Sequence, residues 1–464
     1  MKKLLKELVR KSGGFVELRY HKRISNSFIA QRGRVDVADH SEESGVGVRA
    51  LVEGVWGFAA TSDLEVSSIE GAVRDAQRNA KVLSRVRSKE SSEIRLASSE
   101  LSREDHVAEG TSEILNMSIS EKLSEVIGYE KKLRKASSVI HTAKCHYCEL
   151  VEEKIIVTSD GAEASLKIAQ PEITLTAIAE KGGEQVSARK TAGVVGGWNC
   201  LLAHPSLVNM VDEVAQVAVD LIKAKYPRKG KRRVILSPSV VGLLCHEAIG
   251  HTVEADFVKS GSVARDKIGV KVASDLVSIY DTGMDDGVGY AAGRIPFDDE
   301  GVKTRTAKII DRGILTSYLH NRESSFEFQI HPTGNARAWL YNDEPLIRMR
   351  NTYMLPGTSK LEDMISELDD GYLIEGGGGG QADSNGEFMF GCSHIWEIKN
   401  GKKGRLFRSA TLSGIAFDVL SSVDSVSREF LWDLGSGYCG KGQPAKVDAG
   451  GPYIRCLIHV GGHK

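Results

Sequence analysis

The sequence predicts an α+β protein of two domains, with strands that pair mainly in antiparallel fashion. Short runs such as residues 15–20 and 47–52 have the composition that is typical of strands. Other segments repeat apolar residues at helical spacing, which indicates amphipathic helices. The order of these segments shows no regular strand–helix–strand repeat. A mixed fold is therefore favoured over a doubly wound parallel sheet.

The domain boundary is predicted from glycine content and from one basic segment. Of the 48 glycines, 17 lie in residues 1–232 and 31 in residues 233–464. Glycine allows positive φ and close approach of backbones, so the second half should be richer in tight turns and clefts. The basic segment Tyr226–Arg233 contains a proline and a glycine. We therefore expect an N-terminal α+β domain over residues 1–228 and a glycine-rich C-terminal domain over residues 229–464.

The elements expected in the N-terminal domain follow from local patterns. Ser67 and Glu70 have the spacing of a capping box at the start of a helix. In order, we expect short strands over 14–60, a helix over 67–83, an exposed loop over 86–112, a helix over 119–133, strands over 138–195 and a helix over 207–221.

The C-terminal domain should begin with a strand at residues 233–236, followed by a helix from about Val240. Hairpins come after it, one over residues 308–315 and one turning at Asn400-Gly401. This arrangement predicts a mostly antiparallel sheet that carries the helix beginning near Val240.

Composition excludes several classes of protein. The 61 basic and 62 acidic residues nearly cancel, so nothing in the charge supports binding to nucleic acid or to an anionic membrane. The sequence has no apolar run of the roughly 18 residues that a membrane span needs. Charges at Lys6, Glu7 and Arg10 interrupt the apolar N-terminus, which favours an amphipathic helix over a signal peptide. Seven cysteines do not suggest a disulfide framework, and a reducing cytoplasm is the expected compartment.

The residues most indicative of chemistry are His246-Glu247-Ala248-Ile249-Gly250-His251. In the familiar H-E-x-x-H arrangement the histidines are at positions i and i+4 of a helix and face one metal ion. Here the spacing is i and i+5, which places the two side chains roughly 140° apart on a regular α-helix. One π-type turn would realign them, and such turns concentrate at functional sites. The spacing therefore predicts a bulge near Ala248–Gly250.

If the helix bulges there, His246 and His251 can bind one zinc ion. Glu247 can then act as the catalytic residue, activating a zinc-bound water and later protonating the leaving amine. A third ligand has to come from another part of the chain. The alternative is that this six-residue motif matches a metal-binding pattern by chance, because the sequence has 13 histidines.

Several further motifs resemble those of the TldD/PmbA family, also called the modulator of DNA gyrase family, and specifically its metal-bearing TldD-like members. The likeness is closest over residues 233–464 and looser in the first half. Besides the histidine motif, it is carried by residues 297–301 (FDDEG), 331–335 (HPTGN), 351–357 (NTYMLPG), 378–383 (GGGQAD), 386–390 (GEFMF) and 439–441 (CGK).

The resemblance implies a zinc metalloprotease that hydrolyses peptides or unfolded protein segments within an internal cavity. It implies three zinc ligands, here His246, His251 and Cys439, with Glu247 as the catalytic acid/base. It also implies a dimer, specifically a heterodimer with a paralogous subunit that lacks the zinc motif. Cys245 and Cys456 are rival thiols, although Cys245 is adjacent to His246 and should point away from the histidine face.

The glycine run at residues 376–380 is a second candidate region. It lacks the Lys-Ser/Thr ending of a phosphate-binding loop. Gly378, Gly379 and Gly380 could bind substrate if an extended peptide added there as a strand. A tightly packed turn is the equally weighted alternative.

Three other sequence features give weaker evidence of a functional site. Residues 435–440 match G-x-G-x-x-G, but no helix follows to form a dinucleotide site. Cys145 and Cys148 fall on opposite faces of an expected strand, which disfavours a shared metal. His320, His331 and His394 could line the cleft and stabilise an oxyanion, although most lone histidines are packed or solvated.

Two alternative functions remain open at this point. One is a peptide-binding, chaperone-like subunit with weak or no catalysis, which the presence of Glu247 argues against. The other is a metal amidohydrolase acting on non-peptide amides, which the sequence does not separate from a peptidase.

Overall fold

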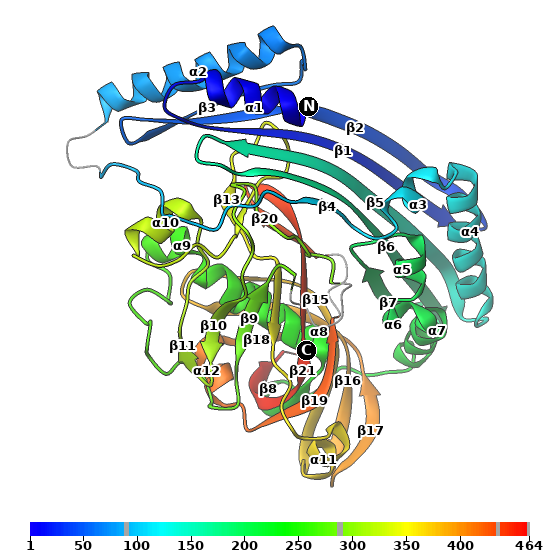
Figure 1. Ribbon diagram of the computed structural model, residues 1–464. Coiled ribbons are helices and arrows are strands. Elements are labelled where there is room, and N and C mark those ends of the chain that lie inside the picture. Colours follow the sequence, from blue (N-terminus) through cyan, green and yellow to red (C-terminus); the bar gives the residue numbers. More distant parts are fainter. Residues whose placement is uncertain (88–91, 285–290, 433–436, 462–464) are drawn as a thin grey trace.

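The computed structural model describes residues 1–87, 92–284, 291–432 and 437–461, and it has the α+β architecture that the sequence predicts (Figure 1). Strands from the first half form one sheet, and strands from residue 230 onward form a second, larger sheet. The curved N-terminal sheet extends over the C-terminal half in Figure 1. None of the helices in the described residues is both long and apolar enough to cross a membrane.

The N-terminal sheet has seven strands in the order β3-β2-β1-β5-β6-β4, with β7 paired to β6. Its pairing is antiparallel except between β4 and β6. The strands are β1 (Phe15–Gln31), β2 (Arg34–Val52), β3 (Val55–Thr61), β4 (Asp105–Val107), β5 (Ile140–Thr158), β6 (Glu163–Lys181) and β7 (Glu184–Gly193).

The expectation of short strands over residues 14–60 is wrong, because β1 and β2 have 17 and 19 residues. Residues 34–44 of β2 are mostly exposed on both faces and therefore lack the apolar alternation that marks a strand.

Helices cover the N-terminal sheet in two groups. Near β1–β3, α1 (Lys2–Lys11) and α2 (Val66–Val86) bury apolar residues in one core. Near β5–β7, a second core contains residues of α4 (Ile119–Lys135) and α7 (Met210–Leu221). The helix expected at 119–133 is therefore confirmed. The short helices are α3 (Thr111–Asn116), α5 (Trp198–Leu202) and α6 (Pro205–Val208).

The predicted capping box at Ser67 and Glu70 is wrong. The helix begins at Val66 after Glu65, and its N-cap side chain makes no capping hydrogen bond. Asp63 instead accepts hydrogen bonds from the Glu65 amide (3.0 Å) and the Ser68 hydroxyl (2.6 Å). The side chain of Asp63 thus binds the backbone just before the helix, whereas Ser67 is already inside it.

The segment predicted as an exposed loop over 86–112 is partly structured where it is described; residues 88–91 lie outside the described residues. It contains β4 and continues across to the C-terminal half. The Ser102 amide donates to the Gly301 carbonyl (2.8 Å), and the Lys303 amide donates to the Glu100 carbonyl (2.9 Å). Ser102 is buried. The loop prediction failed because these partners are about 200 residues distant in sequence.

The larger sheet has twelve strands and is mostly antiparallel, with parallel pairing of β14 with β21 and of β15 with β8. β8 pairs with both β15 and β21, so the strands β8, β15, β16, β18 and β21 close into a ring. The strands are β8 (Gly230–Leu236), β9 (Ile279–Thr282), β10 (Ala307–Asp311), β11 (Ile314–Leu315), β14 (Asn351–Met354), β15 (Asp370–Ala382), β16 (Glu387–Lys399), β17 (Lys402–Phe407), β18 (Ala410–Ile415), β19 (Ser425–Trp432), β20 (Gly437–Lys441) and β21 (Gln443–Val460).

Smaller elements complete the C-terminal half. The hairpin expected over 308–315 is β10–β11, and the turn expected at Asn400-Gly401 joins β16 to β17. The remaining elements are the strand pair β12 (Ala336–Arg337) and β13 (Leu346–Ile347) and the helices α9 (Ala255–Lys259), α10 (Arg322–Glu327), α11 (Leu361–Ser366) and α12 (Ala416–Ser421).

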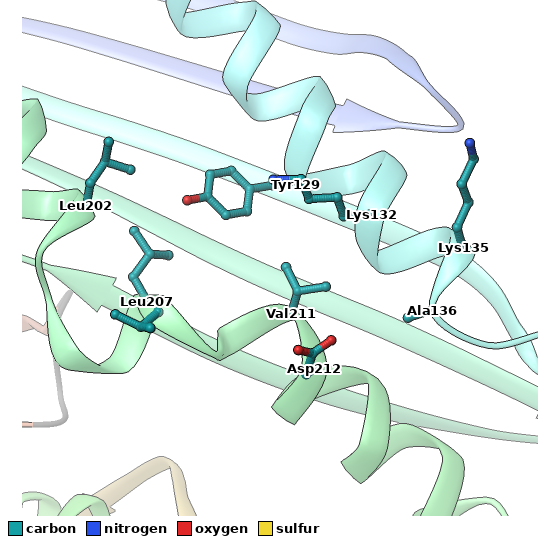
Figure 2. Close-up of a pocket in the computed structure, with 9 residues that line it drawn as sticks. Tyr129, Lys132, Lys135, Ala136, Leu202, Leu207, Val211 and Asp212 are labelled. Carbon is teal, nitrogen blue, oxygen red and sulfur yellow. The ribbon is translucent and has the colours of Figure 1, made fainter.

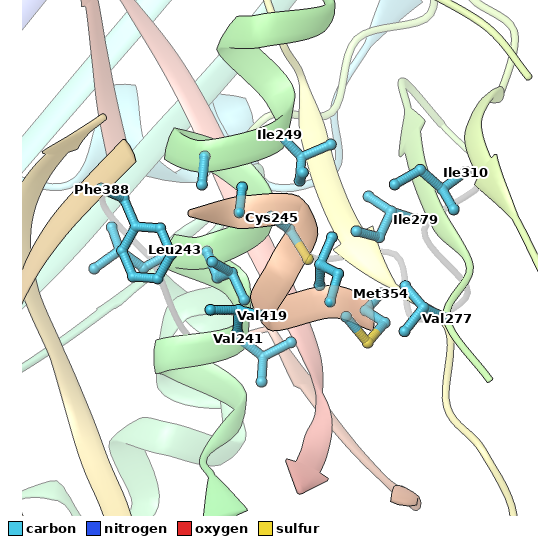
Figure 3. Packing of buried hydrophobic residues seen from close by; sticks show 14 of the residues in the cluster. Val241, Leu243, Cys245, Ile249, Val277, Ile279, Ile310, Met354, Phe388 and Val419 are labelled. Atoms are coloured by element: carbon cyan, nitrogen blue, oxygen red, sulfur yellow. The ribbon is translucent and has the colours of Figure 1, made fainter. Parts of the chain in front are cut away.

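One helix, α8 (Pro238–Leu243), is buried on all sides at the centre of the C-terminal half. It contacts β14, β15, β19 and β21, and the core around it includes Val241, Leu243 and Met354 (Figure 3). A helix that is apolar all round belongs in such an interior. Its continuation carries the histidine motif, which is therefore anchored by the main hydrophobic core.

Candidate metal centre

The histidine motif departs from the α-helix in the way that its spacing predicts. α8 continues directly into a π-helical stretch, η1 (Leu244–Gly250), and then into a short 3-10 turn, η2 (His251–Val253). The wider π-turn brings the two imidazole rings onto one side, with centroids 5.3 Å apart. The prediction of a bulge near Ala248–Gly250 is confirmed.

Cys439 joins the two histidines from a distant part of the chain. It lies on β20, which forms a hairpin with β21. One ligand atom from each of His246, His251 and Cys439 lies within 4.8 Å of the others. The Cys439 Sγ atom is 3.3 Å from Nε2 of His251. Within the described residues this is the only group of three or more histidine, cysteine or acidic side chains close enough to hold one metal ion.

The charges of this group favour a thiolate. Burial on its own would raise the pKa of Cys439. The positive charges of His246 and His251 and their hydrogen bonds to the thiol have the larger, opposite effect and lower the pKa of Cys439 to about 5. Burial would likewise lower the pKa of His251, but hydrogen bonds and charge from Cys439 and Glu254 raise it to about 10. The ligand form of cysteine is thus already favoured at neutral pH.

The donor set fits zinc. Zinc bonds of about 2.1 Å to nitrogen and 2.3 Å to sulfur place two such donors about 3.6 Å apart in a tetrahedral site. The observed separation of 3.3 Å between Cys439 and His251 is close to this value. Nδ1 of His246 is buried without a hydrogen-bond partner, so that ring has unused capacity to coordinate or donate. Two imidazoles and one thiolate leave a fourth position for water or substrate, as catalytic zinc sites do.

Glu247 lies beside the group without belonging to it. Its Oε2 atom is 3.8 Å from Nε2 of His251, and the side chain is one-quarter exposed. A carboxylate at this position can reach a group bound between the three donors while remaining open to water. The geometry therefore suits proton transfer better than coordination.

The rival thiols lie elsewhere. Cys245 points into the apolar core between Leu243 and Ile249 (Figure 3), and burial raises its pKa far above the ordinary value. Cys456 belongs to the same core on β21. Cys145 and Cys148 are on β5, one buried and one half-buried, and neither joins the His/His/Cys group. All seven cysteines are free thiols. The residues 435–440 that match G-x-G-x-x-G lie partly outside the described residues.

The three other candidate histidines are not brought to this group either. His320 is buried against Tyr318 and Phe328, with Nδ1 3.0 Å from the Ser324 hydroxyl. His394 pairs with Glu375 at 3.1 Å. His331 lines a separate surface hollow beside Ile330. An oxyanion role for any of them has no support in this arrangement.

The glycine run lies on β15, where Gly376 has a left-handed backbone (φ +71°) and the pairing with β16 shifts register between Gly377 and Gly380. Gly377 donates its amide to the hydroxyl of Ser239 on α8 (3.2 Å), and β15 contacts the π-helical stretch. On this edge, within the described residues, β8 pairs only with Tyr372–Ile374, so the strand continues beyond β8. Gly379 is exposed and has no other atom near the position of a Cβ. Gly378–Gly380 thus form an accessible strand beside the motif helix.

A groove of 570 Å³ lies far along the chain from this group, between α4 and α6–α7 (Figure 2). Tyr129, Leu207 and Val211 line it, and all its lining residues lie between 129 and 212. It shares no residue with the His/His/Cys group.

Sequence reasoning missed the buried arginine that fixes Cys439. Arg348 donates to the Cys439 carbonyl (2.5 Å) and to the Gln443 carbonyl (2.7 Å), which ties together both strands of the β20–β21 hairpin. The only local signal is the alternation Arg348-Met349-Arg350, in which both arginines are fully buried.

Comparison with known proteins identifies the family. Residues 229–462 match the model described as the PmbA/TldA metallopeptidase C-terminal domain, and residues 16–80 and 112–222 match the first and central domains of the same series. The chain belongs to the PmbA/TldD metallopeptidase family. The resemblance noted in its sequence motifs is therefore confirmed.

Relatives span the whole chain. Metalloprotease MJ0996 of Methanocaldococcus jannaschii is 31% identical over 452 residues, 97% of each chain. A protein of Saccharolobus solfataricus named zinc metalloprotease TldD homolog is 28% identical over the full length of both. Among solved structures, Thermotoga maritima TM0727 superposes with a TM-score of 0.80 at 21% identity, over 99% of each chain. TldE of Thermococcus kodakarensis gives 0.77 at 18% identity, over 99% of this chain and all of that one. These two share the fold.

Proposed function

We propose that this member of the PmbA/TldD family is a zinc-dependent metallopeptidase that hydrolyses peptides or unfolded protein segments. The convergence of His246, His251 and Cys439, with the Glu247 carboxylate next to them, is the observation that carries the proposal. The names of the relatives, one of which includes zinc, support the choice of metal.

The roles of the residues follow from their positions. His246, His251 and Cys439 would hold the ion, which when bound supplies Lewis acidity that polarises the scissile carbonyl and acidifies a water. Glu247 would accept the proton of the attacking water at its carboxylate and return it to the leaving amine. Its partial exposure gives it the access to water that this role requires.

The strand β15 favours peptides as the substrate class. Gly379 and Gly380 are exposed, and at Gly379 no other atom lies near the position of a Cβ, so an extended peptide could pair along Gly378–Gly380 as an added strand. Main-chain pairing tolerates many side chains and requires an unfolded segment. Peptide substrates methylated on single backbone nitrogens test this: kcat/KM should fall at alternate positions, whereas an equal response at every position would contradict strand addition.

Assembly and location are further parts of the proposal. We expect a heterodimer with a paralogous subunit that lacks the zinc motif, in the cytoplasm. Seven free thiols are consistent with a reducing compartment. Co-purification from the native host tests the pairing, and a fully active homodimer as the sole species would contradict it.

One experiment tests the activity itself. The zinc-loaded protein is incubated with a mixed library of unstructured peptides, and products are identified by mass spectrometry. Cleavage that chelation abolishes, and that the Glu247→Gln variant lacks, would support a peptidase. Peptide binding without cleavage would favour the chaperone-like alternative. Cleavage of small non-peptide amides alone would favour an amidohydrolase.

A further inference from the structure

A buried carboxylate that the proposed mechanism does not use lies directly behind the metal centre. Glu254 follows η2, three residues after His251, and its side chain is fully buried. Its Oε2 atom is 3.3 Å from Nδ1 of His251. Nδ1 can therefore donate to the carboxylate, which leaves Nε2, the nitrogen that faces Cys439, as the ring atom that would coordinate when a metal ion replaces the proton between it and the thiol.

The same carboxylate oxygen also contacts the strand that carries the third candidate ligand. Lys441 is on β20, two residues after Cys439, and its Nζ atom is 3.0 Å from Oε2 of Glu254. This ammonium also donates to the Ile347 carbonyl (3.0 Å) and lies 4.4 Å above the Phe257 ring. Glu254 thus connects the helix end and the strand through one oxygen atom, although it is 187 positions from Lys441 in sequence.

We propose that the Glu254–Lys441 ion pair is a clamp that sets the relative position of His251 and Cys439. This proposal rests on the proposed function of the site. Glu254 fixes the ring of His251 from behind, and Lys441 fixes β20 to the same carboxylate. Both are positioning residues, since neither is one of the three converging donors. Their effect is to hold two ligands at coordinating distance before the ion binds, so that less ordering accompanies binding.

Asp256 provides a matched control. It contacts the same ammonium at 2.7 Å, but its side chain is 43% exposed. It also lies next to Phe257 at the start of α9, and within the described part of the chain no hydrogen bond or ion pair joins it to His251. Replacing Asp256 by Asn removes one negative charge from beside Lys441, just as Glu254→Gln does. Only the latter also changes the group that accepts from the His251 ring, since Glu254 contacts both His251 and Lys441.

The test measures zinc and cobalt affinity of the full chain by competition with a chelator. Glu254→Gln should weaken binding about 10- to 100-fold, the range for partners behind a metal ligand. Asp256→Asn should stay within about 3-fold of the wild type. Lys441→Met should weaken metal binding to a similar extent as Glu254→Gln. The double variant should lose no more affinity than the weaker-binding single variant, because both changes remove the same Glu254–Lys441 ion pair.

Several outcomes would overturn the clamp. Wild-type affinity in Glu254→Gln would do so, as would equal losses in Glu254→Gln and Asp256→Asn, or full additivity in the double variant. If circular dichroism shows that Glu254→Gln is unfolded, Glu254→Asp takes its place: it keeps the charge but withdraws the carboxylate by one methylene, and wild-type affinity there overturns the clamp too. A wild type that binds no metal, or whose cobalt spectrum lacks a thiolate band, contradicts the proposed function instead.

Discussion

The Cys439 thiol lies 3.3 Å from Nε2 of His251, although the two residues are 188 positions apart in the chain. Three features produce this contact: the π-turn that rotates His251 toward His246, the β20–β21 hairpin that carries Cys439, and the Arg348 guanidinium that holds the Cys439 carbonyl. The mutual effect on the pKa values is large, with Cys439 lowered to about 5 and His251 raised to about 10. A thiolate poised at neutral pH is a ready zinc ligand.

Cys439→Ala should therefore remove zinc and peptide turnover together. Without the thiolate, two imidazoles hold the ion, and a site with one protein ligand fewer binds much more weakly. Elemental analysis and peptide turnover measure the two effects. Cys456→Ala is the control, because that thiol lies in the apolar core and should affect stability alone. Full zinc and full activity in Cys439→Ala would mean that another residue supplies the third ligand.

Glu247→Gln should separate the chemical step from metal binding. The glutamine retains the shape of the side chain but cannot accept the proton of the attacking water. Turnover should fall by a factor on the order of 10² or more, the usual scale for loss of a general base. Zinc content should match the wild type, because Glu247 is not one of the three converging donors. An empty site in this variant would reassign Glu247 as a ligand.

The bulge should depend on the absence of a side chain at Gly250. Its backbone is in the right-handed helical region (φ −53°, ψ −50°), which alanine also adopts without strain. A Cβ there would, however, overlap the sulfur of the buried Met349. Gly250→Ala should destabilise the protein by about 1–3 kcal/mol through overpacking and should weaken zinc binding.

The double variant Gly250→Ala/Met349→Ala should lose less stability than the sum of the two single losses, because the smaller side chain at position 349 makes room for the added methyl. Chemical unfolding and zinc titration of the three variants check this. Strict additivity would show that the close approach of Gly250 to Met349 is not what constrains the turn.

Local patterns were enough to predict the elements whose causes are local. The helix over α4 follows from the spacing of its own apolar residues, and the π-turn follows from the five-residue interval between His246 and His251. The strand β2 was underestimated because its first half is exposed on both faces. The cap of α2 was misassigned because the helix already begins at Val66, so that Ser67 is inside it, and Asp63, outside the expected pattern, accepts from the Glu65 amide and the Ser68 hydroxyl.

Contacts between distant segments could not be predicted in this way. Cys439 entered through a family resemblance rather than through spacing, since only the tertiary fold brings β20 to the motif helix. Arg348 and Lys441 gave no periodic signal, although each is identified at once by its contacts with the Cys439 strand or with Glu254. Sequence reasoning therefore predicted the two histidines but not the residues that position them.

The buried imidazole of His320 should make the fold less stable in acid. Burial lowers the pKa of this imidazole to about 4, from an ordinary value of 6.5. Between pH 6.5 and 4 the unfolded chain therefore binds a proton that the folded chain does not, so the free energy of unfolding falls as the pH decreases through this window.

From pH 7 to pH 5 this one residue should account for a loss of about 2 kcal/mol, at about 1.4 kcal/mol per pH unit below 6.5. His320→Asn retains a hydrogen-bonding group for Ser324 but cannot take up the proton, so it should lose less stability over that interval than the wild type. His141→Asn, at an exposed position on β5, is the control and should behave like the wild type. Urea unfolding of the three proteins at both pH values measures the difference. An identical fall in the wild type and His320→Asn would show that His320 does not contribute to the acid sensitivity of the fold.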